Sequence, residues 1–274
     1  NKVKTGRFWI YTSKGTPGFP ACTVYDYTAS RHAAWPLRFL KDFKGYLQAD
    51  AYAGFNKLYQ DSAQGTKVTE VGCLAHARRY FYDSALGTSP ESWAHTALGF
   101  IQDLYKIERQ GRKDLLTVDQ IKAWRQAQAP PLLKAFHTWL QEHHTRVLPQ
   151  SLLGKAITYT LNHWQALRRY LEQGFLEIDN NRAERGIRPL AMGRKNYLFV
   201  GNDRGGHAAA TLYSLLETCK QHHINPWLYL KDVLNRISTH PYSKIEELLP
   251  YHWHPSAELM SASSLVLSDS KIAA

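Results

Sequence analysis

The chain has 274 residues, which is enough to bury a sizeable core and to form one large domain or two. A hydrophobic content of 44%, with 8 Trp, 16 Tyr and 10 Phe, is typical of a globular protein and excludes an intrinsically disordered one. The formal net charge of +11 favours a polyanionic partner, because basic side chains that neutralise phosphates release counterions.

The first third of the chain predicts strands that alternate with helices. Aromatic and β-branched residues, bounded by turn residues, predict strands at 7–12, 21–28, 45–49 and 67–74. The first two are expected to form an antiparallel hairpin around the turn at 14–18. Helices are expected from Ser30, as N-cap, to about Phe43, then at 54–60 and from about His76. This order predicts a mixed α/β fold.

Asp50 stands at the C-terminal end of the predicted strand at 45–49. In open α/β sheets, ligand sites gather outside the carboxyl ends of strands, so a carboxylate there is well placed for chemistry. A turn or cap residue before the helix at 54–60 is the alternative. Position alone does not decide between the two.

Residues 90–173 are predicted to be helical, because apolar residues recur there at helical spacing. Pro130 and Pro131 are expected to break the chain between two of these helices. The aromatic stripes in this region are interpreted as core rather than as platforms for base stacking.

The stretch 179–199 holds one acid, Glu184, among five basic residues: Arg182, Arg185, Arg188, Arg194 and Lys195. Ala183, Ile187 and Leu190 recur at helical spacing, and Asp179, Asn180 or Asn181 can cap the helix that they predict. Glu184 then falls in the first turn, where a carboxylate among cations could hold a metal beside bound phosphate. The alternative is a capping box, in which Glu184 accepts from the backbone N–H of Asn181.

The last part of the chain predicts two further helices. Gly201–Gly206 is interpreted as a polar turn, followed by helices from about His207 to His222 and from Pro226 to Ile237. Residues 239–256 are expected to form a short peripheral element. Residues 257–274 are expected to be a disordered tail.

Four blocks of this sequence, in order, resemble transposases of the insertion sequence sixty-six family. The block at 179–199, with Asp-Asn-Asn-Arg-Ala-Glu-Arg and Gly-Arg-Lys-Asn-Tyr-Leu-Phe, resembles the catalytic C-terminal block of that family. The others are Gly45–Phe55, Val71–Phe81 and Leu248–Trp253. The resemblance extends over most of residues 7–253, and the order of the four blocks makes it specific.

The resemblance implies a ribonuclease-H-like mixed sheet with a helical insertion domain. The implied organisation is a core in two parts at 1–85 and 175–238, the insertion at 86–174 and a C-terminal element at 239–256. In such a core an earlier strand carries the first catalytic Asp, and that strand is expected to be missing from this chain. Asp26 lies on the next strand and does not match that acid.

The resemblance also implies the chemistry of an Asp-Asp-Glu transposase. Its second Asp corresponds to Asp50 and its Glu to Glu184, which are expected to be catalytic and to hold Mg²⁺ or Mn²⁺. The reaction implied is cleavage of transposon ends and strand transfer into target DNA. A catalytically incomplete DNA-binding remnant is the alternative, because the first acid is unmatched.

Basic and polar residues near these acids are expected to bind DNA, and a solvated basic face is the alternative for each. The candidates are His76, Arg78, Arg79, Arg185, Arg188, Arg194, Lys195 and Asn196. Cys73-x-x-His76 offers half of a zinc site, but no second Cys or His pair follows at ligand spacing.

The expected setting is a homo-oligomer on DNA in the cytoplasm. No long apolar run or lipid-anchor motif indicates a membrane. The three cysteines, an odd number and widely spaced, indicate a reduced compartment.

Overall fold

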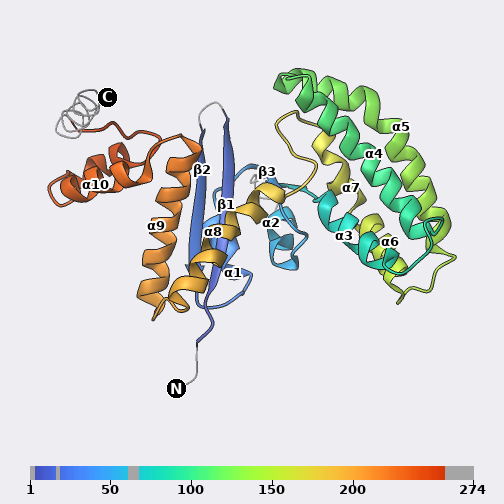
Figure 1. Ribbon diagram of the computed structural model, residues 1–274, viewed down its shortest axis with the longest axis horizontal. Helices are drawn as coiled ribbons and strands as arrows, with labels where there is room; N and C mark the ends of the chain where they lie inside the picture. The colour runs from blue at the N-terminus through green and yellow to red at the C-terminus, as the bar shows by residue number, and fades with distance from the viewer. Residues whose placement is uncertain (1–3, 17–18, 61–67, 257–274) are drawn as a thin grey trace, which may run out of the picture. The chain divides into compact units, whose positions relative to one another are not determined.

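The computed structural model describes residues 4–16, 19–60 and 68–256, and it confirms the α/β class, with helix predominant (Figure 1). The chain divides into two compact units. We call residues 1–31 with 183–274 the hairpin unit and residues 32–182 the helical unit. Within the described ranges, no helix combines the length and apolarity that crossing a membrane requires. The predicted tail at 257–274 lies outside them.

The hairpin unit is built on two strands. β1 (Arg7–Thr16) and β2 (Phe19–Thr28) pair antiparallel, with Arg7 opposite Thr28, which confirms the predicted hairpin. Successive strand residues point to opposite faces, and alternate residues of β2 are buried. Tyr25 and Tyr27 form a small core with Leu190 and Ala210.

Helix α9 (Asp203–Gln221) runs along β2 and covers its outer edge (Figure 1). The hydroxyl of Ser214 accepts the backbone N–H of Tyr25 at 2.8 Å, and the hydroxyl of Thr218 accepts that of Thr23 at 3.2 Å. Helix residues four apart share a face, and strand residues two apart expose their backbone on the same side, so the two spacings match. These hydroxyls therefore take the place of a neighbouring strand.

Part of the predicted polar turn at Gly201–Gly206 is wrong, because α9 already begins at Asp203. The side chain of Asn202 caps the helix by accepting the N–H of Gly205 at 2.8 Å. Glycine at 206 lets the helix approach the strand, since a Cβ there would lie 2.5 Å from the Tyr27 ring. The glycine that suggested a turn instead serves close packing, which local pattern does not reveal.

Replacing Gly206 by Ala is expected to lower the free energy of unfolding by about 1–3 kcal/mol, as overpacking does in other cores. Gly99→Ala is the matched control, because a Cβ at this helical position meets no atom within 4 Å. That variant should gain about 0.5–1 kcal/mol from helix propensity. Urea denaturation measures both. Equal effects of the two substitutions would contradict the close approach at Gly206.

The C-terminal element packs on α10 (Pro226–Arg236), which ends close to the predicted boundary. Buried Asp232 accepts the indole N–H of Trp253 at 2.7 Å and the backbone N–H of Ser256 at 3.3 Å. Burial opposes ionisation of Asp232, but the hydrogen bonds from Ser256 and Trp253, with the Arg236 guanidinium, hold its pKa below the usual value. The short 3₁₀ helix η4 (Tyr242–Leu248) completes this element.

The helical unit contains a second, parallel strand pair, β3 (Gly45–Gln48) and β4 (Val68–Val71). Before it, α1 (Ala34–Phe39) begins later than expected and has no side-chain cap, so the predicted cap at Ser30 is wrong. Pro36 explains the late start. A proline lacks a backbone N–H and fits best in the first turn of a helix, where that N–H has no helical partner.

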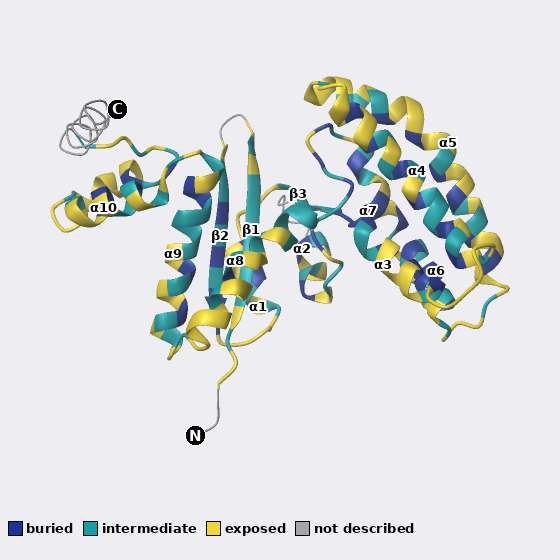
Figure 2. Cartoon of the chain, in the orientation of Figure 1, coloured by how far each residue is buried: buried dark blue, intermediate teal, exposed yellow. Residues whose placement is uncertain are grey.

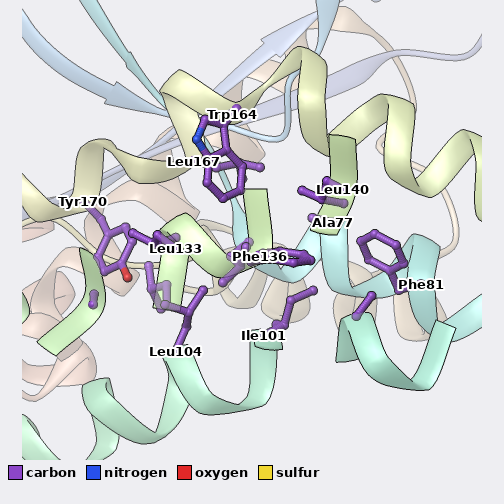
Figure 3. Packing of buried hydrophobic residues seen from close by; sticks show 14 of the residues in the cluster. Ala77, Phe81, Ile101, Leu104, Leu133, Phe136, Leu140, Trp164, Leu167 and Tyr170 are labelled. Carbon is purple, nitrogen blue, oxygen red and sulfur yellow. The ribbon is translucent and has the colours of Figure 1, made fainter. Parts of the chain in front are cut away.

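Helices make up the rest of this unit and bury one contiguous core. After η1 (Ala53–Phe55) and α2 (Asn56–Gln60) they are α3 (Leu74–Ala85), α4 (Trp93–Lys113), α5 (Val118–His144), α6 (Leu152–Asn162), α7 (Trp164–Arg168) and η3 (Arg169–Leu171). Figure 3 shows side chains from these helices meeting around Phe136. In Figure 2 the helix faces that pack together are blue or teal and the outer faces are yellow. The interpretation of the aromatic stripes at 90–173 as core is thus confirmed for Phe136 and Trp164.

The predicted break at Pro130 and Pro131 is wrong, because α5 continues through both prolines. Each proline removes one helical hydrogen bond, to the carbonyls of Gln126 and Ala127. Both prolines and both of these residues are exposed, so water can satisfy the freed carbonyls. Buried residues on either side, among them Phe136, hold the two halves of the helix in line.

Candidate active-site elements

Asp50 lies at the carboxyl end of the parallel pair. β3 ends at Gln48, the backbone N–H of Ala49 donates to the carbonyl of Val71 at 3.3 Å, and Asp50 follows as an exposed residue. The carboxyl ends of parallel strands meet at one edge, so Asp50 and the residues after β4 share that edge. Ala51 has a φ of +55°, in the left-handed region that residues with a Cβ seldom adopt.

The 177–181 segment, which leads into helix α8, is bound along the same edge. The side-chain amide of Gln48 donates to the carbonyl of Glu177 at 2.7 Å. The backbone N–H of Leu74, at the start of α3, donates to the carbonyl of Ile178 at 3.1 Å. Ile178 is 1% exposed. Residues more than a hundred positions apart in the sequence thus meet beside the end of β3.

Cys73 contributes to the same arrangement through its sulfur. The backbone N–H of Asn180 donates to Sγ of Cys73 at 3.1 Å, and Cys73 is buried. Burial raises the pKa of the Cys73 thiol, although backbone N–H groups, that of Asn180 first among them, act in the opposite direction. In this unit Cys73 therefore has a structural role as a hydrogen-bond acceptor.

Asp179 is the last acid before α8, and both of its oxygens accept hydrogen bonds. Oδ2 accepts from the Tyr105 hydroxyl and from the Asn181 side-chain amide, each at 2.8 Å, and Oδ1 accepts from the Asn181 backbone N–H at 3.1 Å. That backbone N–H is the group that a capping box would offer to Glu184. Asp179 therefore fills the role that the capping-box interpretation gives to Glu184.

Helix α8 (Asn181–Tyr197) carries Glu184 in its first turn, as predicted. Most of the helix belongs to the hairpin unit, where Leu190 is buried and the Tyr25 hydroxyl donates to the carbonyl of Gly186. A Cβ on Gly186 would lie 3.1 Å from a methyl group of Ile10, so α8 packs closely on β1.

The expected DNA-binding residues fall into two groups, one in each unit. On α8 the exposed candidates are Arg185, Arg188, Arg194, Lys195 and Asn196. Three of these, at 185, 188 and 195, recur at spacings of three and seven and so share one face of the helix. On α3, Arg78 and Arg79 are exposed and His76 is half-buried.

The structure thus places Asp50 with His76, Arg78 and Arg79 in the helical unit, and Glu184 with the α8 basic residues in the hairpin unit. Sequence reasoning missed the contact between Tyr105 and Asp179. The sequence marks Asp179 only as a possible helix cap. A tyrosine in a helix stripe and an acid before a helix give no local signal of pairing across 74 positions.

Comparisons with known proteins agree with the resemblance. The family model described as "Transposase IS66 family" matches residues 1–208, and the one described as "IS66 C-terminal element" matches residues 214–251. Uncharacterized protein y4hP of Sinorhizobium fredii (strain NBRC 101917 / NGR234) is 32% identical over 267 residues, which cover 92% of this chain and 48% of y4hP. Uncharacterized protein y4jD of the same strain is 35% identical over 239 residues, covering 85% and 46%.

The chain therefore spans about half the length of the curated relatives that it matches. No solved structure matches it.

Proposed function

The chain belongs to the IS66 transposase family, and on that premise we propose that it is the catalytic region of an Asp-Asp-Glu DNA transposase. The whole protein cuts transposon ends and joins the freed 3′-hydroxyl to target DNA. One observation carries this proposal. Asp50 follows β3 at an edge along which the 177–181 segment, leading to the Glu184 helix, is bound.

Asp50 and Glu184 are two of the carboxylates that hold Mg²⁺ or Mn²⁺ in this proposal. The donor set fits such an ion, since carboxylate oxygens are the hard ligands that Mg²⁺ prefers, and Asp50 is exposed. When bound, divalent ions supply activation of a nucleophilic oxygen and neutralisation of charge at phosphorus. Asp179 has no such role, because hydrogen bonds from Tyr105 and Asn181 occupy its oxygens.

The basic residues on α8 and α3 bind the DNA backbone in this proposal. Exposed arginine and lysine side chains make contacts to phosphate that position the duplex without reading its sequence. The exposed face with Arg185, Arg188 and Lys195 fits that role, as do Arg78 and Arg79. Arg194, Asn196 and His76 add polar contacts, and the DNA complex is a homo-oligomer.

The fold that we propose for the whole protein is the ribonuclease-H-like core with the helical insertion at 86–174. α9 covers the outer edge of β2, whereas among the described residues β1 pairs with no strand besides β2. A further strand on the other edge of β1 would complete the sheet and carry the first acid. Asp26 does not replace that acid, because it lies on β2 opposite Trp9.

A DNA-binding remnant without catalysis is the second candidate. The observation in its favour is the formal net charge of +11, which suits DNA binding and requires no metal-holding acid. The two candidates make the same prediction for DNA affinity. They differ in whether a divalent ion supports cleavage of transposon-end DNA.

Asp50→Asn in the full-length protein is expected to lower Mg²⁺-dependent cleavage of transposon-end DNA by about a hundredfold or more, while DNA affinity at fixed salt is retained. The amide removes the charge that holds the ion but keeps the size of the side chain. Asp42→Asn is the matched control, because Asp42 is an exposed acid just before β3. Cleavage assays and binding titrations measure both effects.

An undiminished cleavage rate in the Asp50→Asn variant would show that Asp50 does not belong to the catalytic site. Absence of Mg²⁺-dependent cleavage in the unsubstituted protein, with DNA binding intact, would favour the remnant.

A further inference from the structure

Tyr105 connects the helical core to the segment before α8. It lies on α4, where its ring packs against the core that contains Leu104 and Tyr170. Its hydroxyl leaves that core and donates to Oδ2 of Asp179 at 2.8 Å. Burial first, and the negative charge of Asp179 second, raise the pKa of Tyr105, so the phenol stays protonated and remains a donor at physiological pH.

Two of the hydrogen bonds that Asp179 accepts come from Asn181, the first residue of α8. Asn181 donates both its backbone N–H and its side-chain amide to the same carboxylate. Hydrogen bonds to an ionised acceptor are about twice as strong as those between neutral groups. The start of α8 is therefore tied through Asp179 to a side chain of the helical core.

Two further residues before Asn181, Ile178 and Asn180, are also held by hydrogen bonds. The carbonyl of Ile178 accepts the backbone N–H of Leu74. The backbone N–H of Asn180 donates to the sulfur of Cys73. Glu184 follows three residues after Asn181, within the same helical turn. Any change in the path of the 177–181 segment therefore changes where the first turn of α8 begins.

We propose that Tyr105 and Asp179 are positioning residues, which fix the start of α8 and through it the carboxylate of Glu184. This inference rests on the proposed role of Glu184 as a metal-holding residue. It gives the helices between the two acids a function in catalysis, because α4 supplies the anchoring hydroxyl. Neither residue touches substrate or metal in this scheme.

Tyr105→Phe tests the proposal, because it removes one hydroxyl and keeps the ring that packs in the core. Tyr46→Phe is the matched control. The Tyr46 hydroxyl also donates to a carboxylate of the same unit, Oε2 of Glu172 at 3.1 Å, but that bond does not hold the 177–181 segment.

The first measurement is the alkylation rate of Cys73 in the whole chain, resolved by mass spectrometry. The segment bonds to this buried thiol through Asn180, so reagent reaches the sulfur only when the segment opens. Loss of one hydrogen bond to a charged acceptor should raise the rate about tenfold or more in Tyr105→Phe. Cys219, buried in the hairpin unit, is the internal reference and should not change.

The second measurement is the Mg²⁺ concentration that gives half-maximal end cleavage by the full-length protein. It should rise several-fold in Tyr105→Phe and stay unchanged in Tyr46→Phe. Equal Cys73 rates in the two variants would overturn the anchoring. A faster Cys73 rate with unchanged metal dependence would overturn the positioning of Glu184.

The proposed function fails by a different result. If cleavage survives Glu184→Gln, then Glu184 holds no essential metal, whatever Tyr105→Phe does. If Glu184→Gln abolishes cleavage and Tyr105→Phe behaves like Tyr46→Phe, the positioning role alone is lost.

Discussion

Glu184→Gln is expected to lower transposon-end cleavage by about a thousandfold or more, as removal of a single catalytic group does in other enzymes. The amide is close in size to the carboxylate, so α8 should keep its first turn. It lacks the negative charge that binds a divalent ion. DNA affinity should not fall, because the exposed basic residues of α8 and α3 are unchanged.

Glu247→Gln is the control for this variant. Glu247 belongs to the same unit, and its side chain, which contacts His240 and Lys244, is 59% exposed. Cleavage rates and DNA affinities of both variants, measured at the same Mg²⁺ concentration and salt, provide the comparison. Normal cleavage by Glu184→Gln would show that the acid of α8 is not catalytic.

Arg125→Met is expected to lower the free energy of unfolding of the helical unit by about 3–5 kcal/mol, because it leaves a buried carboxylate without a counter-charge. Arg125 and Glu108 are 3% and 5% exposed, and the guanidinium donates to both carboxylate oxygens, at 2.7 and 2.6 Å. Arg125 also donates to the carbonyls of Tyr170, Gln173 and Gly174. The pair therefore ties α4 and α5 to η3 and to the chain that follows it.

Arg112→Met is the control for the buried pair. Arg112 lies on the same helix as Glu108 and pairs with Glu177 at 2.9 Å, but its side chain is 61% exposed. Its loss should cost about 0–1 kcal/mol, as for other surface ion pairs. Urea denaturation followed by circular dichroism measures both changes. Equal losses in the two variants would show that burial of the Arg125 pair adds no stability.

A double variant, Glu108→Leu with Arg125→Met, separates the charge from the hydrogen bonds. An apolar pair can replace a buried ion pair at little cost when nothing else depends on it. Here the three carbonyls that Arg125 serves would lose their donor. Only partial recovery of stability is therefore expected.

Elements with a strong local pattern were predictable from the sequence. The hairpin, the strand before Asp50, α10 and the placement of Glu184 in the first turn of a helix all follow from alternation, helical spacing or capping residues. These signals are local because each depends on residues within a few positions of one another.

Features that depend on distant partners were not predictable. Pro130 and Pro131 carry a local signal for a break, but exposure of the freed carbonyls and the packing of Phe136 override it. Arg125 and Glu108 have the composition of a solvated helix surface, and only tertiary packing shows that they are buried. The anchoring of Asp179 by Tyr105 depends in the same way on a contact across 74 positions.

The two edges of the hairpin differ, and this difference bears on how the chain behaves as a recombinant product. β2 presents its backbone to Ser214 and Thr218, so it cannot recruit another molecule. On the opposite side of β1 the described residues add no further strand. A strand edge that is left unpaired can template aggregation. The solubility of the chain on expression should therefore depend on what covers this edge of β1, and lysine substitutions along the edge are expected to improve it.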